Sequence, residues 1–108
     1  METVIRIEGA TAICCLFGEL EAFSASQLRQ VMAALTVHRH VVLDLGGVSF
    51  IDSAGLGVIM NYFVSAQSHG RKFFLTGVSD RIRALFEMAR VDNVLNVCES
   101  VEAAEALS

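Results

Sequence analysis

The chain contains no proline, low-complexity tract or internal repeat, so no linker between domains is indicated. Its 108 residues suit one domain with a modest core, and we expect residues 1–108 to form a single domain. No apolar run approaches the roughly 20 residues that span a bilayer. Met1-Glu2-Thr3 does not begin a signal peptide. We therefore expect a cytoplasmic protein that does not insert into membranes.

Basic residues and cysteines are also scarce. Eight Lys and Arg against twelve Asp and Glu give a net charge of −4, which argues against a nucleic-acid partner. The three cysteines form neither a disulfide framework nor a zinc pattern, because Cys14 and Cys15 are adjacent and Cys98 is distant. We interpret them as small buried hydrophobic residues in a reducing compartment. By contrast, the hydrophobic fraction of 54% is high, which indicates that a partner covers some apolar surface.

Short apolar runs bounded by glycine predict β-strands. Gly9-Ala10 joins the first two strands as a hairpin, Gly18 ends the second, and Gly46-Gly47 forms a turn after the third. Together these signals predict about five strands, at residues 3–8, 11–17, 40–45, 72–76 and 94–97.

Four helices are predicted between and after these strands. Serine or aspartate precedes each one as an N-cap: Ser24 or Ser26, Asp52 or Ser53, Ser79, and Ser100. Apolar residues at i, i+3, i+4 and i+7 predict the buried faces of the first two helices, and these are Leu28, Val31, Met32 and Leu35, then Leu56, Ile59, Met60 and Phe63. A hairpin followed by helix–strand units requires right-handed crossovers, so we predict an α/β fold whose mixed sheet is mostly parallel, with the first strand antiparallel.

The most informative stretch is Phe50-Ile51-Asp52-Ser53-Ala54-Gly55-Leu56-Gly57, where a strand runs directly into a helix. Asp52 or Ser53 can serve as an ordinary N-cap, worth about 1 kcal/mol. Ser53 can equally accept a phosphate, because the partial positive charge of a helix N-terminus favours an anion by roughly 0.3–1 kcal/mol. The residues themselves leave both interpretations open.

Enzymatic interpretations of this stretch find little support. A hydrolase nucleophile elbow needs glycine two residues before the serine, where this chain has Ile51. The three histidines, His38, His40 and His69, fall at predicted element boundaries, where we expect exposed bystanders rather than a base or metal ligands. Gly55-Leu56-Gly57 lacks the lysine of a phosphate-binding loop. We therefore expect no enzymatic activity, no metal and no cofactor.

The segment at residues 48–58 resembles the signature of STAS domains, and more narrowly that of the anti-sigma-factor antagonists. The resemblance implies the α/β fold above, and it implies that Ser53 is phosphorylated by an anti-sigma factor that is also a serine kinase of the histidine-kinase-like ATPase fold. A PP2C-type phosphatase would remove the phosphate. The chain departs from the family at Glu21, where aspartate is frequent, and at Ala54, where a second hydroxyl residue is frequent.

A phosphorylated switch also needs a docking surface around Ser53. We predict that Asp52 positions the kinase or the neighbouring loop, and that Gly55 and Gly57 allow a loop or a partner to approach closely. The remaining candidates are Leu20, Glu21 and Phe23 before the first helix, and Ala54, Val58 and Tyr62 on the less buried sides of the second. Ordinary core packing is an equal alternative for Leu20 and Phe23. Two other functions stay open: a STAS docking subunit of a lipid or anion transporter complex, and a scaffold subunit of a stress-sensing assembly.

Overall fold

The computed structural model describes residues 1–107 and forms four strands and four helices over that range. In chain order they are β1 (Glu2–Glu8), β2 (Thr11–Leu20), α1 (Ala25–Leu35), β3 (His40–Ile51), α2 (Ser53–Ser68), β4 (Lys72–Thr76), α3 (Asp80–Met88) and α4 (Val101–Ala106).

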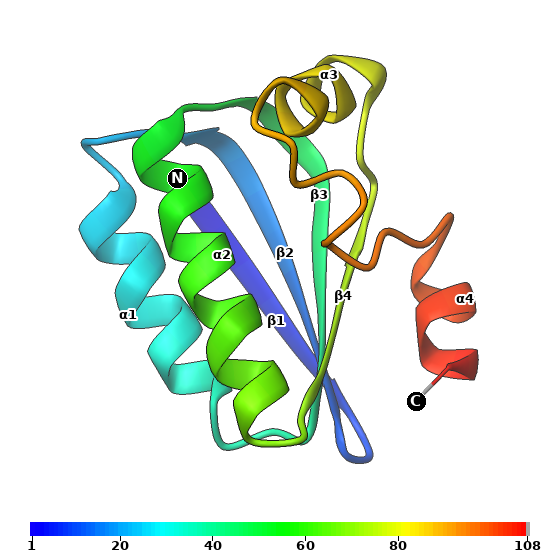
Figure 1. The fold of residues 1–108 in the computed structure, drawn as a ribbon. Helices are drawn as coiled ribbons and strands as arrows, with labels where there is room; N and C mark the ends of the chain where they lie inside the picture. Colours follow the sequence, from blue (N-terminus) through cyan, green and yellow to red (C-terminus); the bar gives the residue numbers. More distant parts are fainter. Residues whose placement is uncertain (108) are drawn as a thin grey trace.

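The strands form one mixed sheet in the order β1-β2-β3-β4. β1 pairs antiparallel with β2, and the other two pairings are parallel, as the α/β pattern predicts. Figure 1 shows α1 and α2 side by side over one face of the sheet, α4 on the opposite side, and α3 at the end where β3 finishes. The parallel strands therefore deliver the loop after β2 and the start of α2 to one edge of the molecule.

The main core lies between the sheet and α1 and α2, and a smaller cluster lies under α4. In α1 the predicted face is confirmed, because Leu28, Met32 and Leu35 are buried. The predicted face of α2 is confirmed in part: Ile59 and Phe63 are buried, and Leu56 and Met60 pack half-buried against the same core. Val58 and Tyr62, predicted to be less buried, are buried as well. Since α2 carries no charged residue, its sequence marks no solvent-facing side, and the packing of both α1 and the sheet decides its orientation.

Two predicted strand ends are also wrong, because β2 continues through Gly18 to Leu20 and β3 through Gly46-Gly47 to Ile51. The pairing of β2 with β3 shifts register twice over this stretch, between Cys15 and Phe17 and between Gly18 and Glu19. Glycines inside strands commonly mark such bulges or a close approach. A Cβ on Gly47 would collide with the Phe17 ring, so this glycine serves packing across the two strands.

The predicted fifth strand at residues 94–97 is not formed. Backbone N–H groups of Val94 and Leu95 donate to the Val91 carbonyl at 3.0 Å, which keeps this segment in a turn. Only a single parallel bridge between Leu75 and Val97 remains. Over residues 1–107 no helix is long and apolar enough to cross a membrane.

Candidate functional site

Asp52 caps α2 and ties it to the loop between β2 and α1. One carboxylate oxygen, Oδ1, accepts a hydrogen bond from Gly55 N at 2.9 Å, which is the N-cap bond. The other, Oδ2, accepts from Ala22 N at 3.1 Å. The backbone N–H of Asp52 donates to the Leu20 carbonyl at 3.0 Å. A single aspartate thus fixes the loop against the helix start.

The same loop is held from within by Ser24. Its hydroxyl donates to the Glu19 carbonyl at 2.8 Å and accepts from Glu21 N at 3.0 Å. Ser24 occupies the N-cap position of α1 but makes no cap hydrogen bond with its side chain, because these loop groups take its hydroxyl. The predicted alternative, Ser26, lies inside α1. The loop is consequently a defined surface, not a loose connection.

Ser53 is the first residue of α2, and its side chain is exposed. Within residues 1–107 its hydroxyl makes no hydrogen bond, so the oxygen is available to solvent and to a partner. The first N–H groups of a helix have no partner inside the helix. Here the N–H of Gly55 donates to Asp52, and the N–H groups of Ser53 and Ala54 make no hydrogen bond within residues 1–107. An anion attached to the Ser53 hydroxyl would meet these N–H groups and the positive end of the helix dipole.

The two glycines in the first turns of α2 have different environments. A Cβ on Gly55 would overlap the Leu20 carbonyl oxygen and lie 2.8 Å from the carbonyl carbon, so the loop packs directly on this glycine. That confirms the predicted close approach for Gly55. A Cβ on Gly57 would meet nothing within 4 Å. Among residues 1–107 nothing packs on the Cβ position of Gly57, and a role in partner binding remains a prediction.

The predicted partner-binding residues divide into exposed and buried groups. Phe23 is 97% exposed, which is unusual for a phenylalanine, while Glu21 and Ala54 are half-buried. Val58 and Tyr62 are buried in the main core, so their predicted place on an accessible surface is wrong. Leu20 is buried there too, so of its two predicted alternatives core packing holds, whereas Phe23 is not a core residue.

Tyr62 is a core residue in detail. Its hydroxyl donates to the Leu35 carbonyl at 3.4 Å, and its ring meets Phe73 edge to face at 4.9 Å. Burial raises the pKa of Tyr62 above its ordinary value, and the Arg71 guanidinium, 5.8 Å from the ring centre, offsets only part of this rise. These contacts orient α2 on the sheet and place Ser53 at its far end.

The structure adds residues from α3 that the sequence reasoning did not assign to the site. A groove of about 300 Å³ runs between Ser53 and the second half of α3, and Met88 beside it is 81% exposed. The signal available in the sequence was topological, because right-handed crossovers bring the segments after β3 and β4 to the same edge. The groove is lined by Phe50, Ile51, Asp52, Ser53, Leu56, Leu85, Phe86, Met88 and Ala89.

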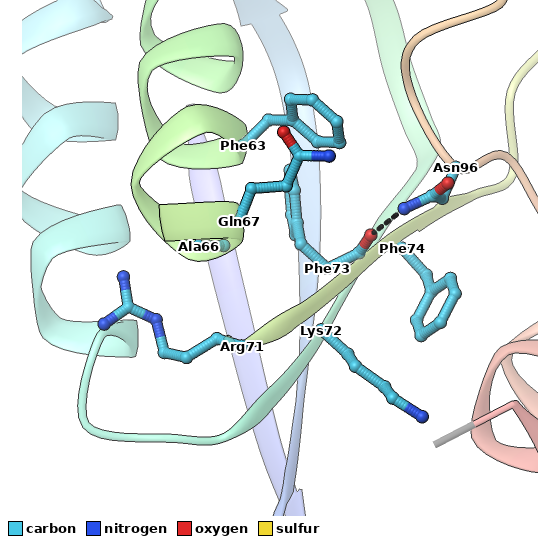
Figure 2. Close-up of a pocket in the computed structure, with 8 residues that line it drawn as sticks. All are labelled: Phe63, Ala66, Gln67, Arg71, Lys72, Phe73, Phe74 and Asn96. Carbon is cyan, nitrogen blue, oxygen red and sulfur yellow. Dashed lines mark hydrogen bonds between the residues drawn. The ribbon is translucent and has the colours of Figure 1, made fainter. Parts of the chain in front are cut away.

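A separate pocket of about 180 Å³ lies near the other end of α2. Figure 2 shows its lining, with Phe63 and Gln67 from α2, Arg71 and Lys72 diverging at its mouth, and Asn96 donating to the Phe73 carbonyl at 3.2 Å. Ten residues of helix, about 15 Å, separate Ser53 from Phe63. This pocket is therefore no part of the Ser53 surface.

Chemical groups for catalysis are not gathered around Ser53. His40 begins β3 and His69 follows α2, so both lie at the end of the molecule away from Ser53. In the part of the chain that the structure describes, no cluster of three His, Cys, Asp or Glu could hold a metal ion. The charged residue directly beside Ser53 is Asp52, which lines the same groove.

Comparison with known proteins identifies relatives over most of the chain. The STAS domain family matches residues 3–104. The anti-sigma-B factor antagonist of Listeria monocytogenes is 33% identical over 82 residues, which cover 74% of this chain and 72% of that protein.

Solved structures share the fold at low identity. An anti-sigma factor antagonist from Mycobacterium paratuberculosis has a TM-score of 0.88 at 18% identity, covering 98% of this chain and 92% of that one. The phosphorylated form of the Bacillus cell fate determinant SpoIIAA has a TM-score of 0.74 at 18% identity, covering 99% and 100%. A sulfate transporter family protein from Wolinella succinogenes has a TM-score of 0.80 at 21% identity, covering 94% and 87%.

Proposed function

Because this chain belongs to the STAS domain family, and its relative in Listeria monocytogenes is an anti-sigma-B factor antagonist, we propose that it is an anti-sigma-factor antagonist controlled by phosphorylation of Ser53. In its unphosphorylated form it binds an anti-sigma factor and thereby frees the sigma factor or another client. The anti-sigma factor is a serine kinase of the histidine-kinase-like ATPase fold. The chain itself is substrate and ligand, not enzyme.

The observation that carries the proposal is the exposed, unbonded hydroxyl of Ser53 at the start of α2. It lies on a surface with apolar groups on both sides: Phe23 on the loop that Asp52 holds, and Met88 at the rim of the α3 groove. Large exposed apolar side chains are typical anchors of protein interfaces. Ser53 would therefore be covered when a partner binds.

Phosphorylation would disrupt such an interface electrostatically. The kinase transfers the terminal phosphoryl group of ATP to the Ser53 hydroxyl oxygen and releases ADP, which adds about −1.5 to −2 charges. The Asp52 carboxylate already lies beside Ser53 at the start of α2. A partner that accommodates this carboxylate would have to bury the new charge beside it, at roughly 2–5 kcal/mol, or about 30-fold to several thousand-fold in affinity.

The fold is suited to survive this modification. The phosphate would lie near the unpaired N–H groups of Ser53 and Ala54, while the Asp52 cap and the contact of Gly55 with Leu20 stay in place. That SpoIIAA, a protein of the same fold, exists in a phosphorylated form supports this proposal. A PP2C-type phosphatase would hydrolyse the phosphoserine and restore binding.

An affinity capture from native cells tests the proposal. Wild type, Ser53→Ala and Ser53→Asp are used as baits, and the recovered bait is analysed by intact mass. We expect a kinase-like partner to be retained by wild type and Ser53→Ala and lost from Ser53→Asp. Equal capture by all three baits, with no phosphorylated form under any growth condition, would contradict the switch. Recovery of a membrane transporter instead would favour a docking subunit, the role compatible with the Wolinella succinogenes likeness.

A further inference from the structure

We propose that the free edge of β1 pairs with β1 of a second copy of this chain, in antiparallel orientation, to form a symmetric dimer with one continuous sheet. The two edges of the sheet differ markedly. Along β4, Leu75 N donates to the Asn96 carbonyl at 2.8 Å, and Cys98 N donates to the Leu75 carbonyl at 2.7 Å. Nothing in residues 1–107 pairs with the outer edge of β1.

β1 has the properties of a pairing strand. It is seven residues long, and its register with β2 is continuous from Glu2 to Glu8 without a bulge. Edge strands that stay unpaired are usually short, bulged or protected by proline or inward charges. β1 is neither short nor bulged and has no proline, and although it carries Glu2, Arg6 and Glu8, its Val4, Ile5 and Ile7 are 58%, 45% and 52% exposed. Such a strand is a template for main-chain hydrogen bonding to another strand.

The charges on β1 select both the partner and the register. If Val4 lies opposite Val4 of the second copy, Glu2 lies opposite Arg6, and by symmetry this favourable pair occurs twice. In a register with Ile5 opposite Ile5 of the second copy, Glu2 would lie opposite Glu8, which pairs two anions. In a register with Arg6 opposite Arg6 of the second copy, two cations would pair. Only the first register is complementary in charge. Arg6 already donates from Nε to Glu8 at 2.8 Å, but its guanidinium carries five N–H donors in all.

The same register brings apolar groups together on both faces. Val4 meets Val4 on the α4 side of the sheet, and Ile5 lies opposite Thr3 on the side of α1 and α2. Glu2, at the start of β1, pairs with Phe17 near the end of β2 that leads to the loop held by Asp52. The Ser53 surface therefore lies at the end of the sheet where β1 begins. Since the two copies of β1 would run antiparallel, a two-fold axis through Val4 would place the two Ser53 surfaces at opposite ends of the joined sheet. The dimer would leave both surfaces open, and it does not depend on the proposed phosphorylation.

Sedimentation equilibrium of the purified full chain, without any partner, tests this dimer. We expect wild type to sediment at twice the chain mass. Val4→Lys places two like charges on the axis and should raise the dimer dissociation constant roughly tenfold or more. Val37→Lys is the matched control, because Val37 is also a valine, is even more exposed than Val4 and lies beyond the end of α1, and this variant should sediment like wild type.

A charge exchange tests the register and guards against misfolding of the first variant. Glu2→Arg and Arg6→Glu should each weaken the dimer about as much as Val4→Lys. The double variant should restore it, because opposite charges then face each other again across the two-fold axis, with their signs exchanged. A wild type that is monomeric up to millimolar concentration would overturn the proposal. A dimer that survives both single exchanges would overturn it as well.

Discussion

Replacing Asp52 by alanine should destabilise the protein by about 2 kcal/mol. The N-cap bond to Gly55 contributes about 1 kcal/mol, and the bond from Ala22 N to the partly solvated carboxylate contributes about 1 kcal/mol more. With an unfolding entropy of about 2.1 cal/mol/K per residue, 108 residues give about 0.23 kcal/mol/K. The melting temperature should therefore fall by about 9 °C.

Ser79→Ala is the matched control for Asp52→Ala. The Ser79 hydroxyl caps α3 by accepting from Ile82 N at 3.2 Å and makes no second hydrogen bond within residues 1–107, so Ser79→Ala should lower the melting temperature by only about 4 °C. Asp52→Asn keeps a single acceptor oxygen and should fall between the two. Calorimetry measures the shifts, and hydrogen exchange should show faster exchange at Ala22 in Asp52→Ala. Equal decreases in melting temperature for Asp52→Ala and Ser79→Ala, with unchanged hydrogen exchange at Ala22, would show that the second hydrogen bond of Asp52 does not contribute to stability.

Further predictions concern the glycines, the thiols and the exposed aromatic residue. Gly55→Ala should destabilise the protein by about 1–3 kcal/mol, because the new methyl group would overlap the Leu20 carbonyl. Gly57→Ala should stabilise it by about 0.5–1 kcal/mol, because the Cβ position there is open and alanine favours the helix. Denaturant titrations measure both free energies of unfolding, and equal effects would contradict the packing described. Burial raises the pKa of the Cys14 thiol to about 12, with the neighbouring Cys15 adding to the rise. Since the thiolate is the reactive form, iodoacetamide at pH 8 should modify at most Cys15 and Cys98 in the folded protein. Mass spectrometry should detect alkylation of Cys14 only after unfolding. The rate at Cys15 should rise as the pH increases, because burial and the Asp44 carboxylate, whose Oδ2 lies 3.8 Å from Sγ, raise its pKa too. Phe23→Ala should leave stability within about 0.5 kcal/mol but weaken binding of the captured kinase about tenfold, and Val37→Ala, at the other end of α1, should change neither.

Much of the fold follows from local patterns in the sequence. The α1 face, the extent of β4 and the caps at Ser79 and Ser100 are confirmed because each depends on neighbours within one turn or one strand. The errors arise where distant segments decide. Gly46-Gly47 has the composition of a turn, yet pairing with β2 carries β3 past it in a bulged strand. The segment at 94–97 has the composition of a strand, yet the turn closed on Val91 leaves it one bridge.

In the candidate site, too, features set by neighbouring residues could be predicted and features set by distant segments could not. The strand-to-helix junction could be predicted from Asp52 and Ser53, but the second hydrogen bond of Asp52 joins residues 30 positions apart and has no local signal. Val58 and Tyr62 were predicted to be accessible because an uncharged helix does not reveal which side faces water. Met88 was missed because the α3 groove exists only once the crossover after β4 has brought α3 beside Ser53.

The central claim is that one phosphate on Ser53 decides whether the surface around this residue binds the anti-sigma factor. Its most direct test is a calorimetric titration of the captured kinase with two homogeneous forms of the chain, unphosphorylated and carrying phosphoserine at position 53, at matched salt. We predict that phosphorylation weakens binding by about 30-fold to several thousand-fold while the melting temperature of the chain alone stays within a few degrees. Equal affinities for the two forms would contradict the account.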